Sequence, residues 1–168
     1  WWSPALRALS APQTLMARLG GANEAFRISF DQDFEAALCE ADRAQPTPPR
    51  LKWAFAGLFD AGFAHSFDIS VKSGERVGGG YGVAVGRVFV IEALHFRDGS
   101  ARSGGLAMLA QALERRGFQW IDAKRLTPEL AADGFDGAPR FDYLAKLKHA
   151  LAVEQVGAWV APALDKAA

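Results

Sequence analysis

The stretch "VGGGYGVAVG", Val77–Gly86, holds more glycine than a β-strand ordinarily does. Glycine in a strand interior is less stable than alanine by roughly 0.5–1 kcal/mol. The runs on either side, "FAHSFDISV" and "RVFVIEALHF", are rich in β-forming residues, and short turns at Lys72–Glu75 and at Gly86–Arg87 separate the three. An antiparallel meander is therefore predicted. There are two explanations for its glycines. They form a tight hairpin with a purely structural role, or they allow another group to approach the backbone closely.

The segments around this meander alternate between strand and helix patterns. Before it the sequence predicts a strand at 25–30, a helix that begins at Asp31 or Asp33, a proline-rich loop at 45–49, and a helix from Arg50 to Gly62. After it we expect a polar loop at 97–105, a helix at 106–117, a strand at 118–126, a short helix started by Thr127 and Pro128, and a helix at 140–152 with Phe141, Leu144, Leu147 and Leu151 facing inward. This order indicates an α/β fold with a mixed, mostly antiparallel sheet flanked by helices and one right-handed crossover.

The length and composition are those of an ordinary globular chain. The 168 residues include 19 basic and 19 acidic side chains, and this balance disfavours a dedicated nucleic-acid binder while leaving room for a local basic patch. A single cysteine, Cys39, allows no intrachain disulfide and fits a reducing, cytoplasmic location. No run of 18 apolar residues is present, so no membrane partner is expected. The prolines at 45–49 are the predicted seam between a remnant N-terminal segment, residues 1–49, and the main domain, residues 50–168.

Two acids interrupt otherwise apolar strand patterns: Asp122 in "FQWIDAK" and Glu92 in "FVIEALHF". If their strands are neighbours, the two carboxylates line one cleft and have perturbed pKa values. Alternatively each acid faces solvent at a strand end, or one pairs with Lys124. His65 in "GFAHSFDI" is either a general base or a hydrogen-bonded core histidine. The three histidines lack metal-ligand spacing, so no metal is expected.

A second signal is "RSGGLA", Arg102–Ala107, where the loop gives way to the helix. Free N–H groups at a helix N-terminus favour anions, and glycines let a pyrophosphate approach. The pattern resembles the coenzyme A loop of GCN5-related N-acetyltransferases, with Arg102, Gly104, Gly105 and Ala107 as its members. The alternative is an ordinary turn and helix cap.

Several stretches in order resemble the leucyl/phenylalanyl-tRNA–protein transferases: "WWSP" at the start, "GFAHSFDI", "VGGGYGVAVGRVFVIEALHF", "WIDAK" and "RFDYL". The resemblance covers most of the chain, and the glycine–tyrosine hairpin is its most specific part. It implies a GCN5-related fold that moves an aminoacyl group from tRNA, or from a smaller aminoacyl donor, to the amine of a protein, peptide or small molecule. No cofactor is implied.

The resemblance also assigns roles to residues. Asp122 matches the family's catalytic aspartate, Glu92 its active-site glutamate, and Phe89 and Ile121 the walls of a pocket for the apolar side chain. The hairpin residues Gly79, Gly80, Tyr81 and Gly82 line the substrate cleft, and Trp1, Trp2 and His65 are further substrate-binding candidates. Lys124 stands where the family has Gln, and we expect Lys124, together with backbone amides near Gly79–Gly82, to stabilise the oxyanion.

Two other functions remain open from the residues. The first is a coenzyme A-dependent N-acyltransferase on the same fold. The second is a non-catalytic relative that binds a ligand.

Overall fold

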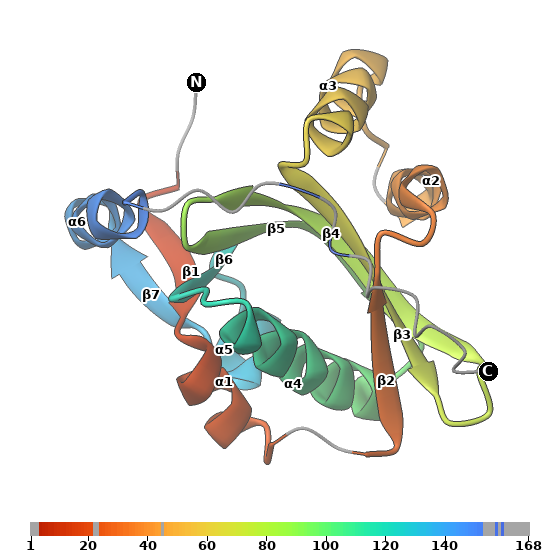
Figure 1. Ribbon diagram of the computed structural model, residues 1–168. Coiled ribbons are helices and arrows are strands. Elements are labelled where there is room, and N and C mark those ends of the chain that lie inside the picture. Colours follow the sequence, from red (N-terminus) through yellow and green to blue (C-terminus); the bar gives the residue numbers. More distant parts are fainter. Residues whose placement is uncertain (1–3, 22–23, 45, 153–156, 158, 160–168) are drawn as a thin grey trace, which may run out of the picture.

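The computed structural model describes residues 4–21, 24–44, 46–152, 157 and 159. In these residues a sheet with the strand order β2-β3-β4-β5-β6-β1-β7 curves around helix α4 (Figure 1). The strands are β1 Leu6–Ser10, β2 Phe26–Phe30, β3 Ala64–Val71, β4 Arg76–Val85, β5 Val88–Phe96, β6 Trp120–Arg125 and β7 Asp136–Pro139. The helices are α1 Pro12–Arg18, α2 Phe34–Ala44, α3 Pro49–Asp60, α4 Gly99–Arg115, α5 Pro128–Asp133 and α6 Arg140–Ala150.

The sheet is mixed and mostly antiparallel, which confirms the predicted fold class. The meander of β3, β4 and β5 is present as expected. The strands β5 and β6, which precede and follow α4 in the sequence, form the parallel pair. Two helix starts predicted from side-chain caps are also confirmed. Asp33 accepts a hydrogen bond from the N–H of Ala36 at 2.8 Å, and Thr127 accepts one from the N–H of Leu130 at 3.3 Å.

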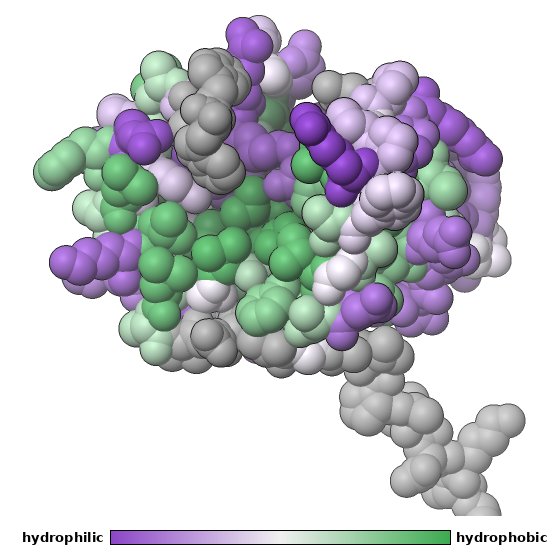
Figure 2. Space-filling view, turned by 90° about the horizontal axis from the view of Figure 1, so that it is seen from above, coloured by the Kyte–Doolittle hydropathy of each residue, from purple (hydrophilic) through white to green (hydrophobic). Residues whose placement is uncertain are grey.

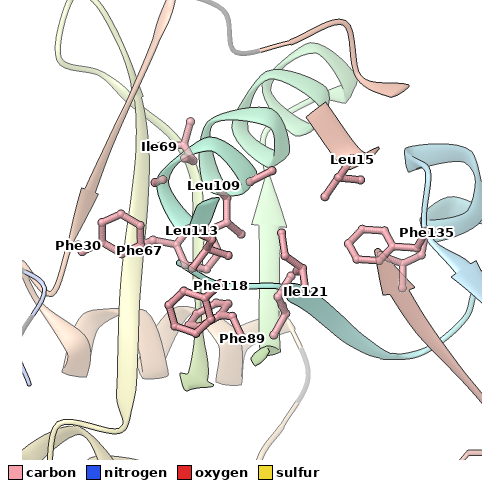
Figure 3. Close-up of a cluster of buried hydrophobic side chains, with 14 of the residues drawn as sticks. Leu15, Phe30, Phe67, Ile69, Phe89, Leu109, Leu113, Phe118, Ile121 and Phe135 are labelled. Atoms are coloured by element: carbon pink, nitrogen blue, oxygen red, sulfur yellow. The ribbon is translucent and has the colours of Figure 1, made fainter. Parts of the chain in front are cut away.

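Helices cover the sheet unequally. The long helix α4 fills the concave face, and α1 packs beside it, while α3 and α6 lie on the other side of the sheet (Figure 1). The main core lies between α4 and the sheet, where Phe67, Phe89 and Ile121 of the strands meet Leu109 and Leu113 of the helix (Figure 3). A smaller apolar cluster, around Tyr81 and Phe34, joins the opposite face to α2 and α3.

The first 49 residues contribute strands to this same sheet. β1 lies between β6 and β7 and pairs with both, and β2 pairs with β3 along its whole length. The strand β1, the helix α1 and the short strand β7 were not predicted from the sequence, because each is brief and lacks a clear alternation of apolar residues.

The glycines of β4 are explained by neighbours within the sheet. A Cβ at Gly80 would collide with the carbonyl oxygen of Ala93 and lie 3.0 Å from the ring of Phe67, and one at Gly82 would lie 2.6 Å from the ring of Phe89. Glycine is therefore required at these positions of β4, because core aromatic rings lie directly against the strand backbone.

Two expectations about helices are wrong. The helix expected at 106–117 begins at Gly99, because the side chain of Asp98 caps it by accepting from the N–H of Ala101 at 2.8 Å. Of the four residues expected to face inward from the last helix, only Leu147 is half-buried. Phe141 is 83% exposed, Leu144 46%, and Leu151, which follows the end of α6, 51%. The helix instead turns Tyr143 and Lys146 toward the sheet, where they contact Arg7 and Trp120 through cation–π interactions.

Candidate active site

Asp122 is the centre of a polar network on the α6 side of the sheet. Its side chain is fully buried, and Oδ2 accepts two hydrogen bonds from Arg7, from Nε at 2.8 Å and from Nη2 at 2.6 Å. Oδ1 accepts one from the backbone N–H of Lys124 at 2.8 Å. Both carboxylate oxygens thus have partners within the protein, which is what a buried charge requires.

Lys124 joins Asp122 to the second acid. Its backbone lies in the left-handed region, with φ of 64°, a conformation that costs a non-glycine residue free energy and that the bond to Asp122 helps to hold. Its ammonium Nζ lies 2.7 Å from Oε2 of Glu92 and donates to the backbone carbonyl of Glu92 at 3.3 Å. The sequence alternative that one acid pairs with Lys124 is therefore confirmed for Glu92.

The pairing of β5 with β6 ends at Asp122, next to the acid–lysine pair. The parallel ladder consists of the pairs Val88 with Trp120, Phe89 with Ile121 and Val90 with Asp122, although β5 continues to Phe96. On the other side of β5, the register with β4 shifts between Tyr81 and Gly82, so that Glu92 is the extra residue of a bulge. Glu92 and Lys124 thus face one another where the two strands separate. We call this place the β5–β6 split.

The charged side chains at the split are accessible to a ligand. The side chain of Lys124 is 42% exposed and that of Glu92 19%, whereas Asp122 is completely covered. Glu92 and Lys124 are therefore the most exposed charged side chains of this network, and Asp122 contacts Lys124 only through the backbone N–H of that residue.

Two tyrosines border the network and remain protonated at neutral pH. Burial raises the pKa of Tyr143 to about 12, and the negative charge of Asp122 adds to the effect. Burial likewise raises the pKa of Tyr81 to about 12, with Glu92 as the next cause. Both phenols are hydrogen-bond donors rather than anions in this environment.

An apolar surface accompanies the polar network on this side of the molecule. Seen from the α3 and α6 side, hydrophobic residues gather across the middle of the face, between more polar margins (Figure 2). A hollow of about 380 Å³ is lined there by residues of α3, β4 and the end of α6, among them Leu58, Val83 and Leu151. Neither Glu92 nor Lys124 lines this hollow, so the hollow and the acid–lysine pair are separate features of the same side of the sheet.

Phe89 and Ile121 do not line this face. Both side chains are completely buried in the core against α4. Successive side chains of a strand point to opposite faces, so Ile121 points away from the face that its neighbour Asp122 occupies. Gly80 and Gly82 likewise turn toward core rings, and Gly79 lies against the carbonyl of Phe67. As packed here, these positions touch the protein's own residues.

His65 is a core histidine, the second of the two interpretations of its sequence. It is 1% exposed, and Nδ1 lies 2.8 Å from Oδ2 of Asp31. Its ring stacks on that of Trp159 at 3.7 Å. The side chain of Tyr81 is also buried, among the rings of Phe34 and Phe55. Trp1 and Trp2 lie outside the described residues.

The segment Arg102–Ala107 does not form a loop before a helix. It lies within the first half of α4, so its N–H groups belong to the helix rather than to a free terminus. A Cβ at Gly104 would collide with the ring of Phe26, and Arg102 forms a bidentate pair with Asp133. The expectation that a loop gives way to a helix at Arg102–Ala107, on which the coenzyme A interpretation rests, is therefore wrong.

Arg7 and Tyr143 were not predicted as members of the site. Arg7 is 115 positions from Asp122 in sequence, and only the order β6-β1 in the sheet brings the two together. Tyr143 falls in the "RFDYL" stretch that carried the family resemblance, and Arg7 lies three residues after "WWSP", so the resemblance is the signal that could have found them.

Within the described residues, no group of three or more His, Cys, Asp or Glu side chains is arranged to hold a metal ion. None of the helices in this part of the chain is long and apolar enough to cross a membrane.

A buried aspartate supporting an exposed acid–lysine pair beside an apolar surface is an arrangement suited to an enzyme that transfers acyl groups to amines. Residues 7–148 match the family model described as leucyl/phenylalanyl-tRNA protein transferase. The chain belongs to this family, and it is an aminoacyltransferase by family.

Individual relatives support the same assignment. A leucyl/phenylalanyl-tRNA–protein transferase from Thiobacillus denitrificans is 36% identical over 157 residues, which cover 88% of this chain and 68% of that protein. The one from Azotobacter vinelandii is 34% identical, over 96% of this chain and 75% of that protein. Among solved structures, a conserved protein of unknown function from Staphylococcus epidermidis has a TM-score of 0.54 at 9% identity, over 80% of this chain and 57% of that one, and shares the fold alone.

Proposed function

We propose that this protein transfers an aminoacyl group from aminoacyl-tRNA to the N-terminal amine of a protein or peptide. The observation that carries the proposal is the partly exposed carboxylate of Glu92 at the β5–β6 split, in a chain of this family. An aminoacyl donor carries an α-ammonium beside its reactive ester. A single accessible carboxylate next to an apolar surface can bind that ammonium and leave the donor's side chain to apolar contacts.

The reaction itself needs no cofactor, because the ester is already activated. The acceptor amine, after losing a proton to solvent, attacks the carbonyl carbon of the ester. A C–N bond forms, the bond from that carbon to the oxygen of the terminal ribose breaks, and the ribose oxygen leaves with the proton that the attacking nitrogen gives up. The protein's contribution is to hold the donor and to stabilise the transient oxyanion.

We assign three roles to the residues of the site. Glu92 binds the α-ammonium of the donor, and Lys124 supplies the positive charge for the oxyanion. Asp122 is a positioning residue, because its oxygens are occupied by Arg7 and by the N–H of Lys124 and it is fully covered. The backbone of Gly79–Gly82 lies in a ladder between β3 and β5, so we assign the oxyanion to Lys124.

The test is a transfer assay with mass-spectrometric detection. Phenylalanyl-tRNA or leucyl-tRNA is incubated with a peptide that has a free N-terminal amine and, in parallel, with its N-acetylated form. We expect the mass of one aminoacyl residue to be added to the free peptide alone. Acetyl-coenzyme A, phenylalanyl-adenosine and a small amine serve as alternative substrates.

Two matched Glu→Gln variants distinguish an effect at the candidate site from the effect of losing an exposed ion pair elsewhere. Glu92→Gln should raise KM for the donor about tenfold or more, as expected for losing a charge-assisted contact. Glu75→Gln removes an exposed ion pair with Arg97 on another part of the sheet and should change nothing. Acetyl transfer without aminoacyl transfer, or equal activity in Glu92→Gln, would contradict the proposal.

A further inference from the structure

Lys124 occupies the position that the proposed function gives to the substrate. Its Nζ is an ammonium 2.7 Å from Oε2 of Glu92, and the donor's α-ammonium is a second cation of the same kind that must reach the same carboxylate. Two cations on one partly buried carboxylate repel one another, and burial weakens the screening of that repulsion. Both cannot be held there at full strength.

We propose that Lys124 is a built-in competitor for the donor's α-ammonium, and that the donor must displace it from Glu92 in order to bind. The proposal rests on the role assigned to Glu92 above and adds a device that selects among donors. A donor whose α-nitrogen is acylated, or replaced by a hydroxyl, cannot displace the lysine, because it brings no charge to exchange for the one it removes.

The backbone of Lys124 suits this exchange. It is held by Asp122 in a left-handed conformation, so the start of the side chain is fixed at the split while its end is 42% exposed. The ammonium can therefore swing away from Glu92 without a change in the strand. The long lysine side chain permits such rotation at little energetic cost.

Displacement also connects binding with chemistry. While Nζ donates to Glu92, at its side chain and at its backbone carbonyl, the ammonium is engaged. Once the donor's ammonium has taken the carboxylate, the freed lysine lies beside the ester carbonyl. Its charge is then available to the oxyanion only when a donor with a free amine is bound.

The experiment measures binding of two stable donor analogues by calorimetry. One is phenylalanyl-adenosine with an amide in place of the ester, and the other is the same molecule with a hydroxyl in place of the α-amino group. Lys124→Met removes the competing charge and keeps an unbranched side chain. We expect Lys124→Met to bind the amino analogue about three- to tenfold more tightly than the unaltered protein does. The hydroxyl analogue should gain less than the amino analogue, because it brings no charge to Glu92.

Kinetics with aminoacyl-tRNA give a second signature. In Lys124→Met, KM for the donor should fall, because competition is gone, and kcat should also fall, because the oxyanion loses its cation. Lys52→Met is the matched control, since it breaks a lysine–aspartate pair of the same 2.7 Å length at α3, and it should leave both constants unchanged.

The outcomes separate this inference from the proposed function. If Glu92→Gln weakens the amino analogue but Lys124→Met leaves it unchanged or weakens it, the competition is disproved and the role of Glu92 stands. If both analogues bind Glu92→Gln as well as they bind the unaltered protein, or if neither binds any variant, the proposed function and the inference both fail.

Discussion

At the scale of single residues, Asp122 is an acid that the protein covers completely. It accepts hydrogen bonds from Arg7 and from the backbone N–H of Lys124, and the phenol of Tyr143 also hydrogen-bonds to it. The role that we propose for Asp122 is to hold Lys124 in position beside Glu92. An Asp122 variant should lose activity whether Asp122 takes part in catalysis or only positions Lys124. The stability of the variant is therefore the more informative measurement.

We predict that Asp122→Ala lowers the free energy of unfolding by about 3–5 kcal/mol, because it leaves the guanidinium of Arg7 largely buried without its anion. Arg7→Met should have a comparable effect by leaving the carboxylate without its cation. The double variant Arg7→Met/Asp122→Ala should be clearly more stable than the sum of the two single changes implies. Chemical denaturation of the four proteins measures this, and additive effects would show that the pair is not energetically coupled.

At the scale of elements, α4 depends on glycine inside a helix. Gly105 faces the sheet, where a Cβ would lie 2.5 Å from the ring of Phe96 and 3.2 Å from Ile69. Gly57 in α3 has nothing within 4 Å of the same position. We predict that Gly57→Ala raises the free energy of unfolding by about 0.5–1 kcal/mol through helix propensity, whereas Gly105→Ala lowers it by about 1–3 kcal/mol through overpacking. Thermal unfolding checks both, and a gain in Gly105→Ala would mean that the helix can move away from the sheet.

The elements also show what sequence could and could not predict. The meander, α2, α3 and β6 follow from alternation, caps and prolines, all of which are local signals. The start of α4 was missed because Gly104 and Gly105 look like a loop until Phe26 and Phe96 are seen to lie against them. The acids Glu92 and Asp122 were found because charges stand out in apolar strands. Their partner Arg7 depends on a sheet order that no local pattern encodes.

At the scale of the whole molecule, the two faces of the sheet have different tasks. The concave face and α4 hold the main aromatic and aliphatic core, where Phe89 and Ile121 are buried (Figure 3). The opposite face carries the charged network and the apolar surface (Figure 2). The glycine-rich strand β4 contributes to both faces. Its glycines let the core rings lie against its backbone on the concave face, and Tyr81 projects from the opposite face.

Tyr81 and Tyr143 on that opposite face predict an alkaline limit to stability. Burial raises the pKa of each from its ordinary value of 10.0 to about 12. The folded protein therefore holds these protons more tightly than the unfolded chain does. Their contribution to stability is complete below about pH 10 and is lost as the pH rises toward 12, because the unfolded chain ionises first.

We expect the melting temperature of the unaltered protein to fall more steeply between pH 10 and pH 12 than that of Tyr81→Phe/Tyr143→Phe, in which neither side chain can ionise. The double variant retains every other titratable group, so the difference between the two proteins reports the two tyrosines. The ultraviolet absorbance of phenolate, followed in the folded protein, gives the ionisation directly. Parallel loss of stability in the two proteins, with phenolate appearing near pH 10, would show that water reaches both rings and that this face of the sheet is more open than its packing indicates.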